Sequence, residues 1–197
     1  MKNFSIVVSS LLLAQRAGAI ELMDIMHIGA AYSTHLLFHE MGHHILAYEV
    51  NAENHKMAFF VRQNGKMYPG LSMADSIPKE SVLPYAAAGD QMAGITFEYG
   101  LQCYRRNPTT FNKALMLFST TDFLIYTILG NYINDDNEFY DTNIIRQETG
   151  CNKTALLSVA LAKTMLNTYR IMSGDDRFIP MIQTGENWAA FVIKYSF

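Results

Sequence analysis

Apolar residues recur through most of this chain at the three- to four-residue spacing of helices, and polar or proline-containing breaks separate the segments. The pattern predicts a short helix that ends at Thr149 and four longer helices, over residues 24–50, 82–106, 110–133 and 153–172. Asn107-Pro108 is expected to end the second of these, and Asn152 is suited to cap the last. Helices therefore make up most of the expected fold.

Two shorter stretches are typical of strands. Met57 to Gln63 is rich in strand formers, Asn64-Gly65 is a strong turn signal, and a return strand starts at Lys66 and closes at Pro69-Gly70. Near the C-terminus a turn at 184–187 precedes a run from Phe191 to Phe197 in which apolar and polar residues alternate. We therefore predict a mainly α (α+β) fold, in which a helical domain carries a small β-hairpin and a short C-terminal β segment.

Length and composition limit the classes of protein. The 197 residues fit one domain with a single core, and charged residues make up only 17% of the chain. The formal net charge is −3 and the basic residues do not cluster, which argues against a nucleic-acid partner.

The first 19 residues have the pattern of a secretory signal peptide. Lys2 precedes an apolar run, and Ala17-Gly18-Ala19 resembles a cleavage site. We expect a mature domain over 20–197, exported to the periplasm or cell envelope, with an uncleaved membrane anchor as the alternative. In such a compartment Cys103 and Cys151 either pair or remain buried thiols.

The main chemical signal is the sequence HEMGH over residues 39–43, within the first long helix. Residues four apart lie on one face of a helix, so His39 and His43 can offer two imidazoles to one ion. Glu40 then lies beside the ion, where it can take a proton from water that Zn2+ has made more acidic. His35, one turn earlier, is either a partner of this group or a polar residue of the helix face.

A third ligand is needed, and the sequence offers several carboxylates. Asp90 and Glu98 lie on the otherwise apolar helix over 82–106, where a buried carboxylate needs a metal or another partner. Asp135 and Asp136 lie in the acidic segment over 134–141 and are oxygen ligands if that segment forms a site.

The order of these pieces resembles the site-two protease family of metallopeptidases. HEMGH, the hairpin after His55 and the small-residue stretch AAAGDQMAG over 86–94 follow one another as in that family. The resemblance implies a zinc site whose third ligand is Asp136 or Asp135, ahead of Asp90 and then Glu98. This chain has Asp90 and Gly94 where the family has proline and asparagine, and its helices carry more charge, so membrane association stays open.

The leading hypothesis is therefore a zinc-dependent hydrolase, and specifically a metallopeptidase that acts on a peptide or protein with Glu40 as general base. The alternative is a zinc-binding structural or interaction protein of the cell envelope without turnover. A third interpretation has no metal and treats the histidines as buried polar groups with protein partners.

Overall fold

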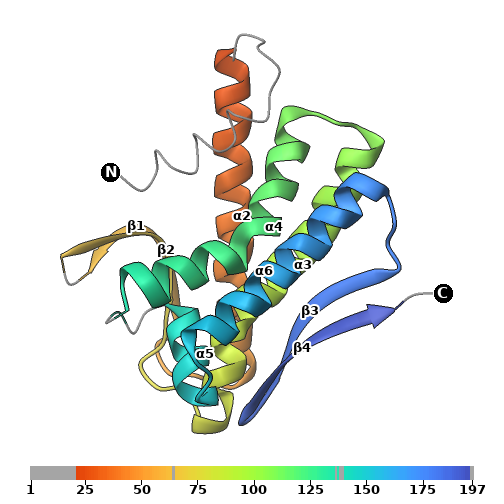
Figure 1. Cartoon of the computed structure of the whole chain (residues 1–197). Coiled ribbons are helices and arrows are strands. Elements are labelled where there is room, and N and C mark those ends of the chain that lie inside the picture. The colour runs from red at the N-terminus through yellow and green to blue at the C-terminus, as the bar shows by residue number, and fades with distance from the viewer. Residues whose placement is uncertain (1–20, 64, 136, 138–139, 196–197) are drawn as a thin grey trace.

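The structure, a computed structural model, describes residues 21–63, 65–135, 137 and 140–195 and is mainly helical (Figure 1). The helices are α2 (Leu22–Glu49), α3 (Val82–Arg106), α4 (Thr110–Ile128), α5 (Asp141–Thr149) and α6 (Lys153–Ser173), with the 3-10 turn η1 (Lys79–Ser81) and the π-helical turn η2 (Leu129–Ile133). The antiparallel hairpins are β1 (Lys56–Gln63) with β2 (Lys66–Met73), and β3 (Phe178–Gly185) with β4 (Trp188–Tyr195). The expected mainly α (α+β) fold is confirmed. The expected signal peptide lies outside the described residues.

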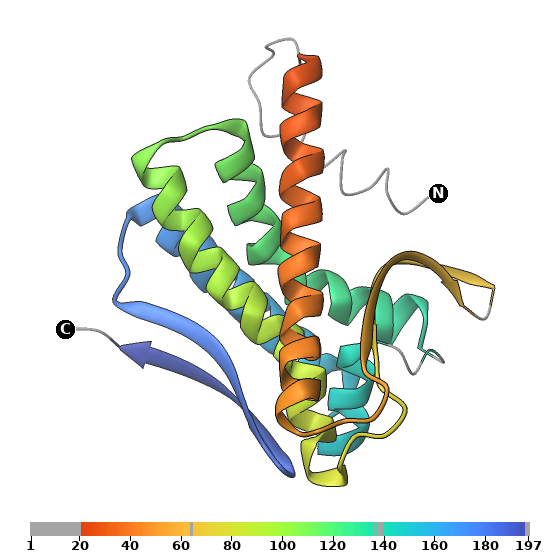
Figure 2. The ribbon, with the colours of Figure 1, turned by 180° about the vertical axis from the view of Figure 1, so that it is seen from behind.

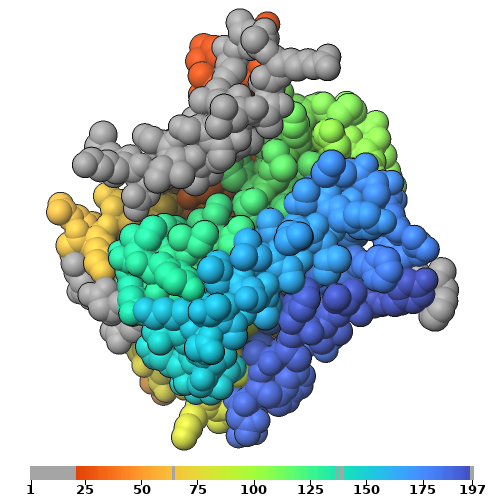
Figure 3. Space-filling view, viewed as in Figure 1, coloured from red at the N-terminus to blue at the C-terminus, as the bar shows by residue number. Residues whose placement is uncertain are grey.

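The long helices form the body of the molecule, and the hairpins lie on its outside. α2, α3 and α4 pack against one another, α6 lies on α4, and β3 packs on α3 and α6. The other hairpin packs on α2 through β2, and the view from behind shows it beside the lower half of that helix (Figure 2). α5 and α6 form a continuous surface next to the β3–β4 hairpin (Figure 3). Segments from most of the chain thus meet around the lower half of α2.

Local signals explain several helix ends. The Asn152 side chain accepts a hydrogen bond from the Ala155 N–H at 2.7 Å, so the expected cap of α6 is confirmed. Gly150 and Gly174 follow α5 and α6 with φ values of +66° and +73°, a conformation that favours glycine. The bounds predicted for α3 match those observed, 82–106.

Two segments differ from their sequence-based expectation. β2 does not close at Pro69-Gly70 but continues to Met73, because the ladder skips Pro69, which has no N–H to donate. The helix predicted over 110–133 changes to π geometry at Leu129. There Gly130 lies so close to Tyr140 and Thr142 that a side chain at 130 would collide with both.

Small residues allow α2 and α3 to approach closely. Ala86, Ala87 and Ala93 are fully buried. A Cβ at Gly42 of α2 would collide with the backbone carbonyl of Ala88 in α3. The helix propensity that Gly42 costs, up to about 1 kcal/mol, is thus offset by interhelical contact.

One helix of the described chain, Thr110–Ile133, is long and apolar enough to cross a membrane by length and composition. However, 61% of its apolar window is buried inside the molecule, as in an ordinary core helix. Cys103 and Cys151 are separate, partly buried thiols.

Candidate metal centre

Three side chains from two helices converge on one point. His39 and His43 lie one turn apart on α2, and Asp141 is the first residue of α5. Asp141 Oδ2 lies 3.2 Å from His39 Nε2 and 3.2 Å from His43 Nε2, and the two Nε2 atoms are 3.4 Å apart. The three atoms therefore form a nearly equilateral triangle.

This triangle fits a zinc ion. Ligand atoms at about 2.0–2.1 Å from a tetrahedral zinc are about 3.3–3.4 Å from one another, which is close to the three distances observed. Gly89 of α3 faces the same point, and a Cβ there would overlap the Nε2 atoms of both His39 and His43. The side-chain atom that is missing at Gly89 thus leaves room where an ion would lie. Three ligands leave a fourth position open, as in catalytic zinc sites.

The other ring nitrogen of each histidine already has a partner. His39 Nδ1 lies 3.1 Å from Asp122 Oδ2, and His43 Nδ1 lies 2.7 Å from the backbone oxygen of Tyr85. Both partners accept hydrogen bonds, so each Nδ1 carries the proton and each Nε2 presents a lone pair. Two lone pairs and a carboxylate that face one another repel unless a metal ion or protons lie between them. The chain therefore fixes the tautomers that bind a metal.

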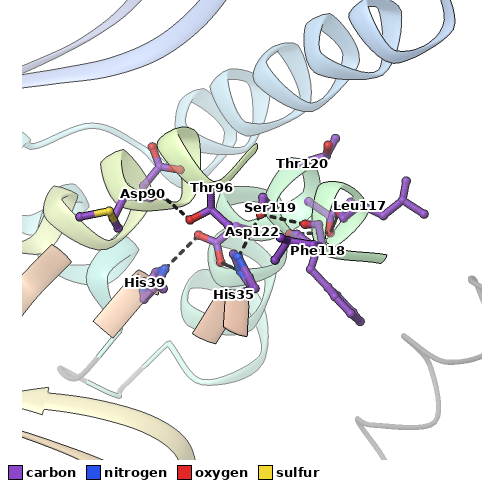
Figure 4. A network of polar contacts seen from close by, with 12 residues as sticks. His35, His39, Asp90, Thr96, Leu117, Phe118, Ser119, Thr120 and Asp122 are labelled. Atoms are coloured by element: carbon purple, nitrogen blue, oxygen red, sulfur yellow. Dashed lines mark hydrogen bonds and ion pairs between the residues drawn. The ribbon is translucent and has the colours of Figure 1, made fainter. Parts of the chain in front are cut away.

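Asp122 is held in turn by a second histidine (Figure 4). His35 Nε2 lies 2.7 Å from Asp122 Oδ1, and His35 Nδ1 lies 3.2 Å from the Ser119 hydroxyl. His35, His39 and Asp122 are at most 5% exposed. Of the two roles considered for His35, the structure therefore supports that of a partner, acting through Asp122.

Glu40 lies beside the triangle but is not one of its members. It is only 4% exposed, and the Ser72 backbone of β2 is hydrogen bonded to its carboxyl group. β2 passes so close that a Cβ at Gly70 would lie 2.7 Å from Glu40 Oε1. Burial raises the pKa of Glu40, although His39 and His43 oppose the shift, and a raised pKa suits a general base that works near neutral pH.

The electrostatics of the three converging groups are coupled. Burial disfavours the charged form of each, but the partners outweigh it: Asp122 and Asp141 raise the pKa of His39 well above its usual range, and Asp141 raises that of His43. The same pairs lower the pKa of Asp141 despite its burial. The cluster thus favours an added positive charge, either protons or a metal ion.

The carboxylates proposed from the sequence as third ligands lie elsewhere or outside the described residues. Asp136 is outside them. Asp135 is half-exposed and pairs with Lys153 at 2.5 Å and Arg146 at 3.1 Å. Asp90 pairs with the buried Lys163, and Glu98 accepts hydrogen bonds from both terminal guanidinium nitrogens of Arg170, at 2.6 and 2.8 Å.

Asp141, the carboxylate that reaches the histidines, lies in the acidic segment over 134–141 but was not singled out from the sequence. The expected ligands, Asp135 and Asp136, lie just after the helix predicted over 110–133, whereas the structure uses the start of the next helix. The available signal was an aspartate at the beginning of a short helix, which is also a common helix-start residue. Its proximity to His39 depends on the turn through η2 and the intervening loop.

Comparisons with known proteins add no relative: no protein-family model, curated protein or solved structure matches this chain.

Proposed function

We propose that the protein is a zinc-dependent hydrolase, and specifically a metallopeptidase. The observation that carries the proposal is the convergence of His39 Nε2, His43 Nε2 and Asp141 Oδ2 beside the buried carboxyl group of Glu40. A zinc ion in this site supplies a Lewis acid that acidifies water and polarises a carbonyl group.

The residues of the chain then have separate roles. His39, His43 and Asp141 hold the ion, while Asp122 and the Tyr85 carbonyl hold the imidazole rings in the binding tautomer. Glu40 accepts a proton from the attacking water, and the Ser72 N–H keeps its carboxyl group in place.

Two features support a peptide substrate over other hydrolysable groups. The HExxH pattern on a helix is typical of metallopeptidases, and its combination with the hairpin and the small-residue helix resembles the site-two protease family. In addition, β2 runs directly beside Glu40 and pairs only with β1 among the described residues. A strand in this position suits the pairing of an extended peptide beside the base.

The test is Glu40→Gln. We expect this variant to keep about one zinc ion per chain, measured by elemental analysis, and to lose hydrolysis of fluorescein-labelled casein, because glutamine cannot accept the proton. Glu49→Gln, an exposed position on the same helix, is the matched control and should keep both properties. Full activity in Glu40→Gln would exclude Glu40 as the base.

A second candidate function is a zinc protein without turnover, with a structural or interaction role. The burial of the site favours it, since His39, His43 and Glu40 are 2%, 3% and 4% exposed. Replacement of zinc by Co2+ separates the two functions, because acetohydroxamate changes the visible spectrum only if a coordination position is open. An unchanged spectrum, together with no casein hydrolysis, supports the structural role.

A further inference from the structure

Two buried hydroxyl groups next to the metal centre make no hydrogen bond of good geometry with the described residues. They are the Tyr85 hydroxyl of α3 and the Ser72 hydroxyl of β2, and both oxygens are fully buried. A buried polar group without a partner costs about 1–3 kcal/mol, so such groups in a folded protein call for an explanation. An explanation here is a bound molecule that supplies the missing partner.

The two hydroxyls lie next to each other. The Ser72 side chain is close enough to interact with the Tyr85 hydroxyl, and the Ser72 backbone contacts the carboxyl group of Glu40. Asp141 and Glu40 both act electrostatically on the Tyr85 hydroxyl. The Tyr85 side chain lies beside the site, since its ring also contacts that of His43.

Tyr85 is also held in place by a metal ligand. Its ring packs against the His43 ring at 5.1 Å between centroids, and its backbone oxygen pairs with His43 Nδ1. The residue lies one helical turn before Gly89, which faces the ion position. Its hydroxyl is therefore fixed relative to the metal before a substrate binds.

We propose that Tyr85 donates a hydrogen bond to the substrate oxygen that becomes negatively charged during hydrolysis, and that Ser72 positions the Tyr85 hydroxyl. This inference rests on the proposed function. Water attacks the carbonyl carbon, its proton goes to Glu40, and the carbonyl π electrons move onto the oxygen. Tyr85 donates its hydrogen bond to that oxygen and keeps its proton. A donor of this kind typically contributes about 10²- to 10³-fold to kcat.

The test uses Tyr85→Phe, which removes only the hydroxyl. Tyr104→Phe is the matched control, because it is the same substitution on the same helix, about 28 Å further along it. Zinc content and the urea midpoint should be close to those of the wild type in both variants, since the contact between the Tyr85 and Ser72 hydroxyls is not a hydrogen bond of good geometry. A structural hydroxyl would instead lower the midpoint on removal.

The decisive readout is acetohydroxamate binding to the Co2+ form, followed in the visible spectrum, because a hydroxamate oxygen takes the place of the substrate oxygen. Tyr85→Phe should raise the Kd about tenfold or more, Ser72→Ala should raise it less, and Tyr104→Phe should leave it unchanged. On casein, Tyr85→Phe should lower kcat about 10²- to 10³-fold with little change in KM.

An unchanged Kd in Tyr85→Phe overturns the inference whether or not casein is cleaved, and so does unchanged kcat in an active enzyme. A loss of zinc in Tyr85→Phe also overturns it, because the residue then serves the ion and not the substrate. Failure of the proposed function is a different result: zinc-loaded wild type that does not hydrolyse casein.

Discussion

Two polar networks meet at α3, and their charges are balanced in different ways. Toward α6, Asp90 pairs with Lys163, and Glu98 pairs with Arg170. Toward α2 and α5, the described ion pairs of Asp122 and Asp141 are all with histidines. The first network contains permanent cations, whereas the second obtains positive charge only from protons or from an ion in solution.

The difference shows why a carboxylate on an apolar helix is ambiguous in a sequence. Asp90 and Asp141 are the same residue type in similarly buried surroundings, but their partners assign them different tasks. Burial raises the pKa of Asp90 even beside Lys163, whereas its histidine partners lower the pKa of Asp141. The charge of Asp90 is neutralised by a lysine of the same chain, so that pair needs no ligand. The charge of Asp141 is neutralised only when the imidazoles beside it take up protons or a metal ion.

Of the substitutions that this comparison suggests, Gly89→Ala should have the largest effect, on zinc binding. Gly89→Ala should reduce zinc content from about one ion per chain to nearly none, because the new methyl group would overlap both Nε2 atoms where the ion would lie. Elemental analysis after zinc loading and dialysis measures this. Gly94→Ala is the control on the same helix, since a Cβ there meets nothing within 4 Å. If Gly89→Ala retains a full equivalent of zinc, the ion does not occupy this site.

Substitutions in the ion pairs between α3 and α6 should change the stability of the protein and not its zinc content. Asp90→Asn leaves Lys163 buried without its counter-charge, which typically costs about 3–5 kcal/mol. Urea denaturation measures the loss, and zinc content should stay at the wild-type value. Asp135→Asn, the same change in an exposed ion pair, should leave the urea midpoint nearly unchanged.

A double substitution sharpens this second prediction. Asp90→Leu together with Lys163→Met replaces the pair by apolar groups and should recover most of the lost stability. An Asp90→Asn protein that is as stable as the wild type would contradict a structural role for the pair.

The smallest effect is expected at Asp122. Asp122→Asn keeps an acceptor for His39 Nδ1 but removes the negative charge, so zinc should bind about 10- to 100-fold more weakly. Competition with a chelator of known affinity measures this change. Ser119→Ala acts three hydrogen bonds from His39, through His35 and Asp122, and should change the affinity by less than about threefold. Equal affinities in the two variants would show that the Asp122 charge does not act on the ion.

Most of the fold was predictable because its signals are local. Asn107-Pro108 marks the end of α3, Asn152 begins α6 through its own side chain, and Gly65 lies at the turn between β1 and β2. The α2 part of the site is local in the same sense, since the spacing of His39 and His43 alone places them on one helix face.

The rest of the site depends on contacts between distant segments. Asp141 lies 102 residues from its partner His39, and within an acidic loop the sequence gives no reason to prefer it over Asp135 or Asp136. Asp90 and Glu98 were correctly expected to need partners. Those partners, Lys163 and Arg170, lie 73 and 72 residues further on, beyond the reach of any local pattern.

The glycine contacts between α2 and α3 have a mechanical consequence. Gly42 of α2 contacts the backbone of α3 at Ala88, and Gly89, the residue after Ala88, contacts the two imidazoles. The closest approach of the two helices is therefore next to the position of the ion. The ligands themselves come from α2 and α5, and α3 contributes the close backbone at Gly89, so a wider α2–α3 crossing would open the site on its α3 side. Zinc should link α2 to α5 through Asp141, and the start of α5 should be the most mobile part of the site in the protein without its ion.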